Sequence, residues 1–161
     1  MGSPVAVAYV KGGPLAPDLC GTVSFWEYGC GTWVSTAIRG LPPYEPATDD
    51  RPPIGPHGFH LHENGDCTVG DEKNPFQAAG GHWNPDDQPH GNEAGDFPVL
   101  FSNNGLSIMG FFTDRFQPLA AIGKAVIIHR YPDDYRTQPD GDAGPRLGCG
   151  VVVAWPGGPP P

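Results

Sequence analysis

The chain has 161 residues, a length that fits one domain and can bury a hydrophobic core without several disulfides. Its 24 glycines and 21 prolines leave little room for long helices, and no apolar stretch is long enough to span a membrane. The 18 acidic residues outnumber the 9 basic ones, and a formal charge of −9 disfavours nucleic acid and anionic membrane surfaces as partners.

Short apolar runs bounded by Gly, Pro, Asn and Asp dominate the chain, a pattern typical of all-β sandwiches and barrels. They predict eight strands, at residues 5–10, 21–26, 30–38, 58–62, 100–101, 106–114, 125–129 and 149–155. Between strands that carry histidines lie two long polar loops, 63–96 and 130–147, and loops of this length in a compact domain are usually functional. We expect residues 1–155 to form one domain and the Pro/Gly tail 156–161 to be disordered.

Six histidines are the main candidates for function: His57, His60, His62, His82, His90 and His129. His60 and His62 stand two apart in an expected strand, so both imidazoles project from one face of it, while Phe59 and Leu61 share the other. Two imidazoles on a rigid face suit copper or zinc, although a single His-x-His pair is more often two surface histidines. The loop residues His82, His90 and Asp96 add nitrogen and oxygen ligands of the kind that zinc accepts.

Four short blocks of the sequence together carry a specific family resemblance. They are residues 58–67 (GFHLHENGDC), 80–85 (GGHWNP), 123–134 (GKAVIIHRYPDD) and 144–151 (GPRLGCGV). They resemble segments of the copper/zinc superoxide dismutases of bacterial type. In order, the blocks match that family's metal-binding signature, its bridging-histidine segment, the strand and loop at its fourth copper histidine, and its active-site arginine with the disulfide cysteine. The resemblance covers roughly residues 20–155. It implies an eight-stranded antiparallel Greek-key β-barrel or sandwich with an immunoglobulin-like architecture.

The resemblance also implies a role for each matching residue. The implied copper ligands are His60, His62, His82 and His129. The implied zinc ligands include His82, His90 and Asp96, with His82 shared between the two metals as an imidazolate. The remaining implied roles are an Asp133 link between a copper and a zinc ligand, a structural His57, an Arg146 that binds the superoxide anion, and a Cys67–Cys149 disulfide. Without this context, Arg146 would be a surface residue or ion-pair partner, and the two cysteines would be buried thiols.

One zinc position departs from the family pattern. Glu93 stands, in the string Glu93–Asp96, where the family has a histidine. A carboxylate is an acceptable zinc ligand, so the expected zinc set is His82, His90, Glu93 and Asp96. The alternative is that Glu93 is solvated and that zinc binds weakly or not at all.

Two further departures concern charge and cysteine. Pro139 and Asp140 replace the basic residue and the threonine that the family has before the arginine, so we expect weaker steering of superoxide. The other basic residues near these segments are Lys124, Arg130 and Arg136. Cys20 and Cys30 have no counterpart in the family pattern. We expect them to be two separate thiols, with a disulfide between them as the rival.

The function implied is the copper-catalysed disproportionation of superoxide to O₂ and hydrogen peroxide, with zinc structuring the site and His82 passing a proton. Copper and zinc are the expected cofactors, and the superoxide anion is the expected partner. The chain would act as a monomer or a homodimer, and the disulfide favours an extracytoplasmic or secreted protein. Two other functions are possible for such a sequence. One is a copper-buffering module without turnover, which would not need Arg146. The other is a structural relic of the family, which would be free to lose a copper ligand.

Overall fold

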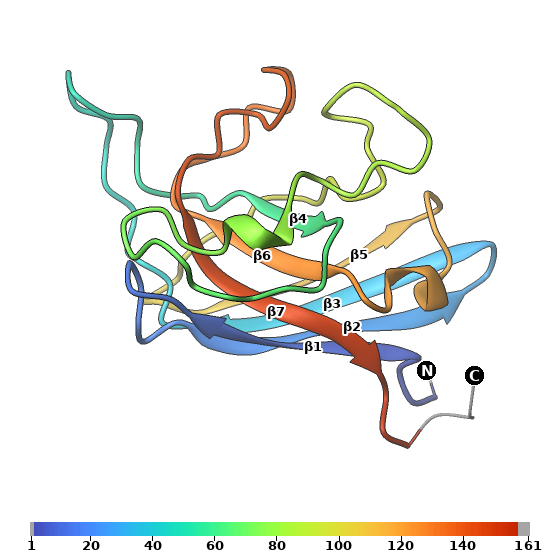
Figure 1. Cartoon of the computed structure of the whole chain (residues 1–161). Coiled ribbons are helices and arrows are strands. Elements are labelled where there is room, and N and C mark those ends of the chain that lie inside the picture. The colour runs from blue at the N-terminus through green and yellow to red at the C-terminus, as the bar shows by residue number, and fades with distance from the viewer. Residues whose placement is uncertain (1, 158–161) are drawn as a thin grey trace.

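The computed structural model describes residues 2–157 and contains one antiparallel sheet of seven strands (Figure 1). The strands are β1 (Ala6–Gly12), β2 (Cys20–Tyr28), β3 (Gly31–Arg39), β4 (Phe59–His62), β5 (Ser107–Thr113), β6 (Ala125–His129) and β7 (Arg146–Ala154). Their order in the sheet is β4-β6-β7-β1-β2-β3-β5. Two short 3-10 helices, η1 (Gln77–Ala79) and η2 (Pro118–Ala121), are the only helices of residues 2–157, and neither is long and apolar enough to cross a membrane. The all-β prediction is confirmed.

The strand count and the start of the last strand are the main differences from the prediction. Residues 100–101 form no strand of the sheet, since Leu100 only exchanges two backbone hydrogen bonds with His57, of 2.8 and 2.9 Å. Pro98, just before this segment, has no N–H to extend the ladder. Strand β7 begins at Arg146, three residues earlier than expected, because Arg146 pairs with His129 across a β-bulge. Of the tail predicted to be disordered, residues 158–161 lie outside the described residues.

The core lies on the concave side of the curled sheet and positions β4 and β6. Phe59 and Leu61 of β4 are fully buried in it, as the alternation in the sequence predicts. All five residues of β6 are buried, because Val126 and Ile128 face the main core while Ile127 faces a second, smaller cluster. Strand β6 therefore lies between two packed layers, and its last residue is held rigidly.

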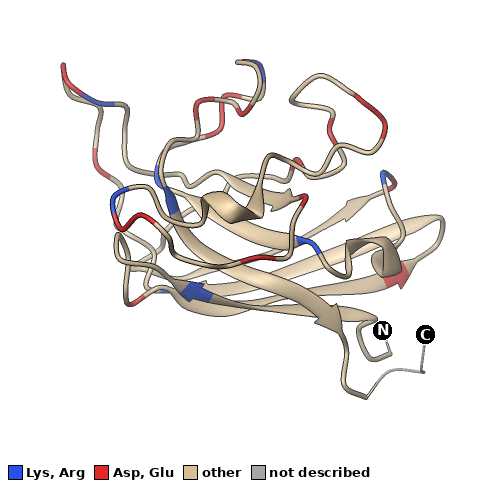
Figure 2. Cartoon of the chain, viewed as in Figure 1, with Lys and Arg blue, Asp and Glu red and all other residues tan. Residues whose placement is uncertain are grey.

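The long loops after β4 and before β7 rise on the same side of the sheet (Figure 1). Acidic residues lie mainly in the loops, whereas the strands contain few charged residues (Figure 2). The histidines at the ends of β4 and β6 lie where this loop layer meets the sheet. Any ion held there is enclosed by sheet on one side and loops on the other.

Candidate metal centre

Strands β4 and β6 present three histidines to the space under the loops. His60 and His62 alternate with the core residues of β4, and β4 pairs with β6, which ends at His129. A backbone bridge between His62 and His82 attaches the fourth histidine from the long loop. The ring centroids of His60 and His82 are only 3.9 Å apart. The fold thus brings together the four histidines that the sequence predicts as copper ligands.

Each of these four rings uses one nitrogen in a hydrogen bond and leaves the other free. The engaged atoms are His60 Nε2 with Asp133 Oδ2 (2.6 Å), His62 Nδ1 with Gly80 O (2.9 Å), His82 Nδ1 with Glu93 Oε2 (2.8 Å) and His129 Nδ1 with Gly144 O (2.9 Å). His60 Nδ1 and His82 Nε2 are buried with no partner, and the Nε2 atoms of His62 and His129 lie 3.4 Å apart. Ligand atoms of the four residues lie within 4.8 Å of one another. A set of four nitrogens without sulfur fits a copper ion.

Two imidazoles and two carboxylates converge on a second point beside the first. His82 Nδ1 lies 2.8 Å from Glu93 Oε2 and 3.3 Å from Asp96 Oδ1, and His90 Nδ1 lies 3.2 and 3.1 Å from the same oxygens. A tetrahedral ion with bonds of about 2.0 Å has ligand–ligand edges of roughly 3.3 Å, so this spacing fits zinc. Asn84 holds the other oxygen of Glu93 at 3.0 Å, and Asp96 Oδ1 is buried without a hydrogen-bond partner.

Asp133 connects two sets of side chains. The first set is His60, His62, His82 and His129, and the second is His82, His90, Glu93 and Asp96. Asp133 Oδ2 lies 2.6 Å from His60 Nε2 and its Oδ1 lies 2.9 Å from His90 Nε2. A Cβ atom at Gly141 would come within 2.0 Å of this Oδ1, so only glycine fits, and its φ of 67° also favours glycine. The carboxylate contacts one ring of each set, as the link that the family resemblance implies for Asp133 requires.

The electrostatics of the two sets differ. Burial, together with the neighbouring His129, holds the pKa values of His60 and His62 well below the usual range. Burial also lowers the pKa of His129 to about 3, although its hydrogen bond to Gly144 acts in the opposite direction. Burial opposes protonation of His90 as well, but its hydrogen bond to Asp133 and the charge of Asp96 raise its pKa. His60, His62 and His129 therefore offer neutral lone pairs, whereas the surroundings of His90 favour its protonated form.

A cavity of about 470 Å³ opens above the first set of histidines, between the two long loops. Arg146, at the start of β7, is the one basic residue among those that line it, and Asp140 lines it too. Burial lowers the pKa of Arg146, against the charge of Asp140. The other basic candidates named from the sequence do not line this cavity: Lys124, Arg130 and Arg136.

His57 takes no part in either set. It is fully buried, with Nδ1 at 2.9 Å from the carbonyl oxygen of His129 and Nε2 at 3.0 Å from that of Pro42. Both ring nitrogens face backbone carbonyls, so neither is directed at a metal position. The ring ties the end of β6 to the loop after β3.

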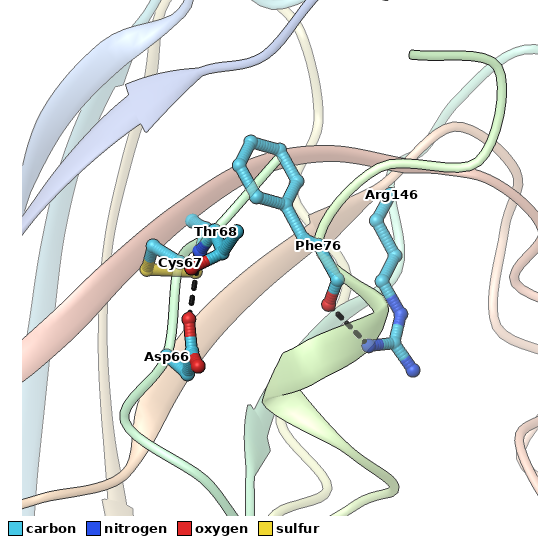
Figure 3. Close-up of a disulfide and its surroundings, with 6 residues drawn as sticks. Asp66, Cys67, Thr68, Phe76 and Arg146 are labelled. Atoms are coloured by element: carbon cyan, nitrogen blue, oxygen red, sulfur yellow. Dashed lines mark hydrogen bonds between the residues drawn. A yellow bond between two sulfur atoms is a disulfide. The ribbon is translucent and has the colours of Figure 1, made fainter. Parts of the chain in front are cut away.

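The cysteines follow the prediction. Cys67 and Cys149 form a disulfide with a Cα–Cα distance of 5.6 Å, which attaches the loop after β4 to β7 (Figure 3). Cys20 and Cys30 are free thiols. Cys20 pairs with Arg39 at one end of the β2–β3 hairpin, whereas Cys30 lies in the turn at the other end, so the geometry excludes a bond between them.

Sequence reasoning missed the backbone groups that hold these side chains. The carbonyls of Phe76 and Gly80 accept hydrogen bonds from Arg146, and that of Gly80 also pairs with His62. Backbone carbonyls have no signature in residue types, so only the fold reveals them. Asn84, which donates a hydrogen bond to Glu93, was detectable as a second polar residue beside His82 in the block Gly80–Pro85.

Comparisons with known proteins agree on one family. The family model described as copper/zinc superoxide dismutase (SODC) matches residues 19–152. A superoxide dismutase [Cu-Zn] from Deinococcus radiodurans is 35% identical over 83% of this chain and 77% of its own length. An extracellular superoxide dismutase [Cu-Zn] from Drosophila melanogaster is 32% identical over 91% of this chain and 83% of its own. The solved Cu/Zn superoxide dismutase from Brucella abortus superposes with a TM-score of 0.71 at 28% identity, covering 91% of this chain and 98% of that one.

Proposed function

The chain belongs to the copper/zinc superoxide dismutase family, and on that premise we propose which of its residues hold each metal and which act on the substrate. The protein is a superoxide dismutase, an oxidoreductase that converts superoxide to O₂ and hydrogen peroxide with copper and zinc as cofactors. Bound copper supplies the one-electron couple that takes an electron from one superoxide anion and returns it to another.

We assign copper to the four free ring nitrogens: His60 Nδ1, His62 Nε2, His82 Nε2 and His129 Nε2. The observation that carries this assignment is that His60, His62 and His129 each have the other ring nitrogen hydrogen-bonded. Such engagement fixes both the tautomer and the orientation of a ligand ring. The other nitrogen of His82, Nδ1, faces the carboxylates of the second set. The lowered pKa values of three of these histidines keep their lone pairs available at neutral pH.

We assign zinc to His82 Nδ1, His90 Nδ1, Glu93 Oε2 and Asp96 Oδ1. Support comes from their spacing of 2.8 to 3.3 Å and from the burial of Glu93, which is only 7% exposed. With Glu93 included, four protein ligands close the site, as is usual for structural zinc. His82 would then serve both sets, and its Nε2 would carry a proton whenever it is not a ligand.

Arg146 acts on the substrate rather than on either metal. Its guanidinium lines the same cavity as His62, His82 and His129, and a fixed positive charge there attracts and orients a small anion. All of these residues lie in one chain, so the site needs no second copy, whether the protein is a monomer or a homodimer.

The role of Arg146 is tested by Arg146→Ala. We expect superoxide turnover to fall by roughly ten-fold or more while copper and zinc contents stay at the wild-type level. Arg136→Ala is the matched control, because its side chain is 87% exposed and does not line the cavity. Equal loss in the two variants, or no loss in Arg146→Ala at moderate salt, would rule out the role proposed here.

We also propose an extracytoplasmic location. A disulfide between Cys67 and Cys149 persists in oxidising compartments, and the Drosophila relative carries the name extracellular. Fractionation of the source cells, with activity measured in each fraction, tests this. Activity confined to the cytoplasm would contradict it.

A further inference from the structure

The guanidinium of Arg146 is held by two backbone carbonyls. One terminal nitrogen donates to Phe76 O at 2.8 Å and the other to Gly80 O at 2.6 Å. Within residues 2–157, the arginine ion pairs are those of Arg51 and Arg136, so no carboxylate pairs with Arg146. The carbonyls therefore set the direction of the guanidinium while leaving its charge available to an anion in the cavity.

Phe76 reaches this position with an unusual backbone conformation. Its φ of 64° and ψ of 24° lie in the left-handed region, which bulky residues seldom adopt. A bulky residue keeps this backbone conformation only when its surroundings impose it, and such residues concentrate at functional sites. The conformation turns the carbonyl of Phe76 toward Arg146, directly before helix η1 (Gln77–Ala79).

The packing of the Phe76 ring holds the backbone in this conformation. It is 4% exposed and packs in the smaller apolar cluster, with Ile127 of β6 and the disulfide residue Cys149. Gly13 lies against the ring, because a Cβ there would come within 2.6 Å of two ring carbons. Figure 3 shows the ring pointing away from Arg146, so that the side chain is anchored on one side and the carbonyl is presented on the other.

We propose that Phe76 is a positioning residue for the superoxide site: its buried ring fixes the left-handed backbone that aims the Phe76 carbonyl, and through it Arg146, at the cavity. The inference rests on the role proposed above for Arg146. Gly80 alone cannot set the guanidinium plane, because a single hydrogen bond leaves it free to rotate about the contact. The second bond, to Phe76, fixes that plane.

The test is the affinity of the copper- and zinc-loaded protein for azide, a small singly charged anion, followed by optical titration. Phe76→Ala removes the anchor and should weaken azide binding roughly five-fold or more, as expected when a hydrogen bond to a charged group is loosened. Metal contents and the copper absorption band in the absence of azide should not change. Ile38→Ala is the matched control, because it truncates a fully buried side chain of the main core, outside the smaller cluster.

Gly13→Ala tests the anchor without altering Phe76. Its φ is not in the left-handed region, so alanine fits the backbone, but the new methyl group displaces the ring and should also weaken azide binding. In the Phe76→Ala background the methyl has room, and its next neighbour, Leu147 O, is 3.7 Å away. The double variant should therefore bind azide no more weakly than Phe76→Ala alone, and additive losses would contradict the proposal.

Arg146→Ala separates the two claims. If it leaves azide affinity unchanged, the role proposed for Arg146 fails, and the inference about Phe76 fails with it. If Arg146→Ala weakens azide binding while Phe76→Ala behaves like Ile38→Ala, only the positioning role is overturned. In the Arg146→Ala background, Phe76→Ala should have no further effect. A full additional loss there would show that Phe76 acts by another route.

Discussion

Single residues decide the ligand chemistry of this site, and Glu93 is the one that departs from the family pattern. Its sequence position identified it as a candidate, and the fold brings its Oε2 to 2.8 Å from His82 and 3.2 Å from His90. The sequence could not distinguish a ligand from a solvated carboxylate, because that depends on Asn84 holding the other oxygen. This local hydrogen bond directs Glu93 inward.

The assignment of Glu93 predicts a specific order of zinc affinities. Glu93→Gln should weaken zinc binding, because it replaces an anionic oxygen by a neutral amide, and Glu93→His should restore it with an imidazole. Competition with a chromogenic chelator measures the affinities. Glu72→Gln, at an exposed position in the same long loop, should bind zinc like the wild type. Equal affinity in all four proteins would show that Glu93 is not a ligand.

At the scale of elements, the sequence predicted most of the sheet but not the parts that depend on tertiary contacts. The alternation in β4 correctly separated Phe59 and Leu61 from His60 and His62. The segment 100–101 was wrongly predicted as a strand, because apolar residues alone do not reveal that the chain leaves the ladder after one bridge. The carbonyls of the loop between Cys67 and His82 were also beyond prediction, since its path is set by packing against β6 and β7.

The disulfide should contribute strongly to stability because it joins residues 82 positions apart. The double variant Cys67→Ser/Cys149→Ser, compared with the wild type in the metal-free state, should lose about 3–5 kcal/mol in the free energy of unfolding. Urea denaturation measures this loss. The control Cys20→Ser/Cys30→Ser removes two free thiols and should change stability by about 0.5 kcal/mol or less. A similar loss in both pairs would contradict a special role for the crosslink.

For the whole molecule, the distribution of charge limits the capture of an anionic substrate. The net charge is −9, most acidic residues lie in the loops (Figure 2), and Asp140 lines the cavity together with Arg146. The sequence predicted weaker steering from the replacement of basic residues before the arginine. The structure adds that Lys124, Arg130 and Arg136 do not line the cavity, so Arg146 provides the local positive field.

Asp140→Asn should therefore increase the rate of superoxide capture. Removing one negative charge from the cavity wall should raise kcat/KM about two-fold at low ionic strength, and the gain should shrink as salt screens the field. Pulse radiolysis over a range of salt concentrations measures both effects. Asp142→Asn makes the same change in net charge outside the cavity lining and should give a smaller gain. Equal gains would assign the effect to overall charge rather than to Asp140.

The central claim is that two metals share the ring of His82. The measurement that tests it most directly is a crystal structure of the oxidised protein loaded with both metals, with anomalous scattering recorded at the copper and zinc absorption edges. We predict copper at Nε2 of His82, next to His60, His62 and His129, and zinc at Nδ1, next to His90, Glu93 and Asp96. A fully metallated structure in which His82 contacts neither metal would contradict the account.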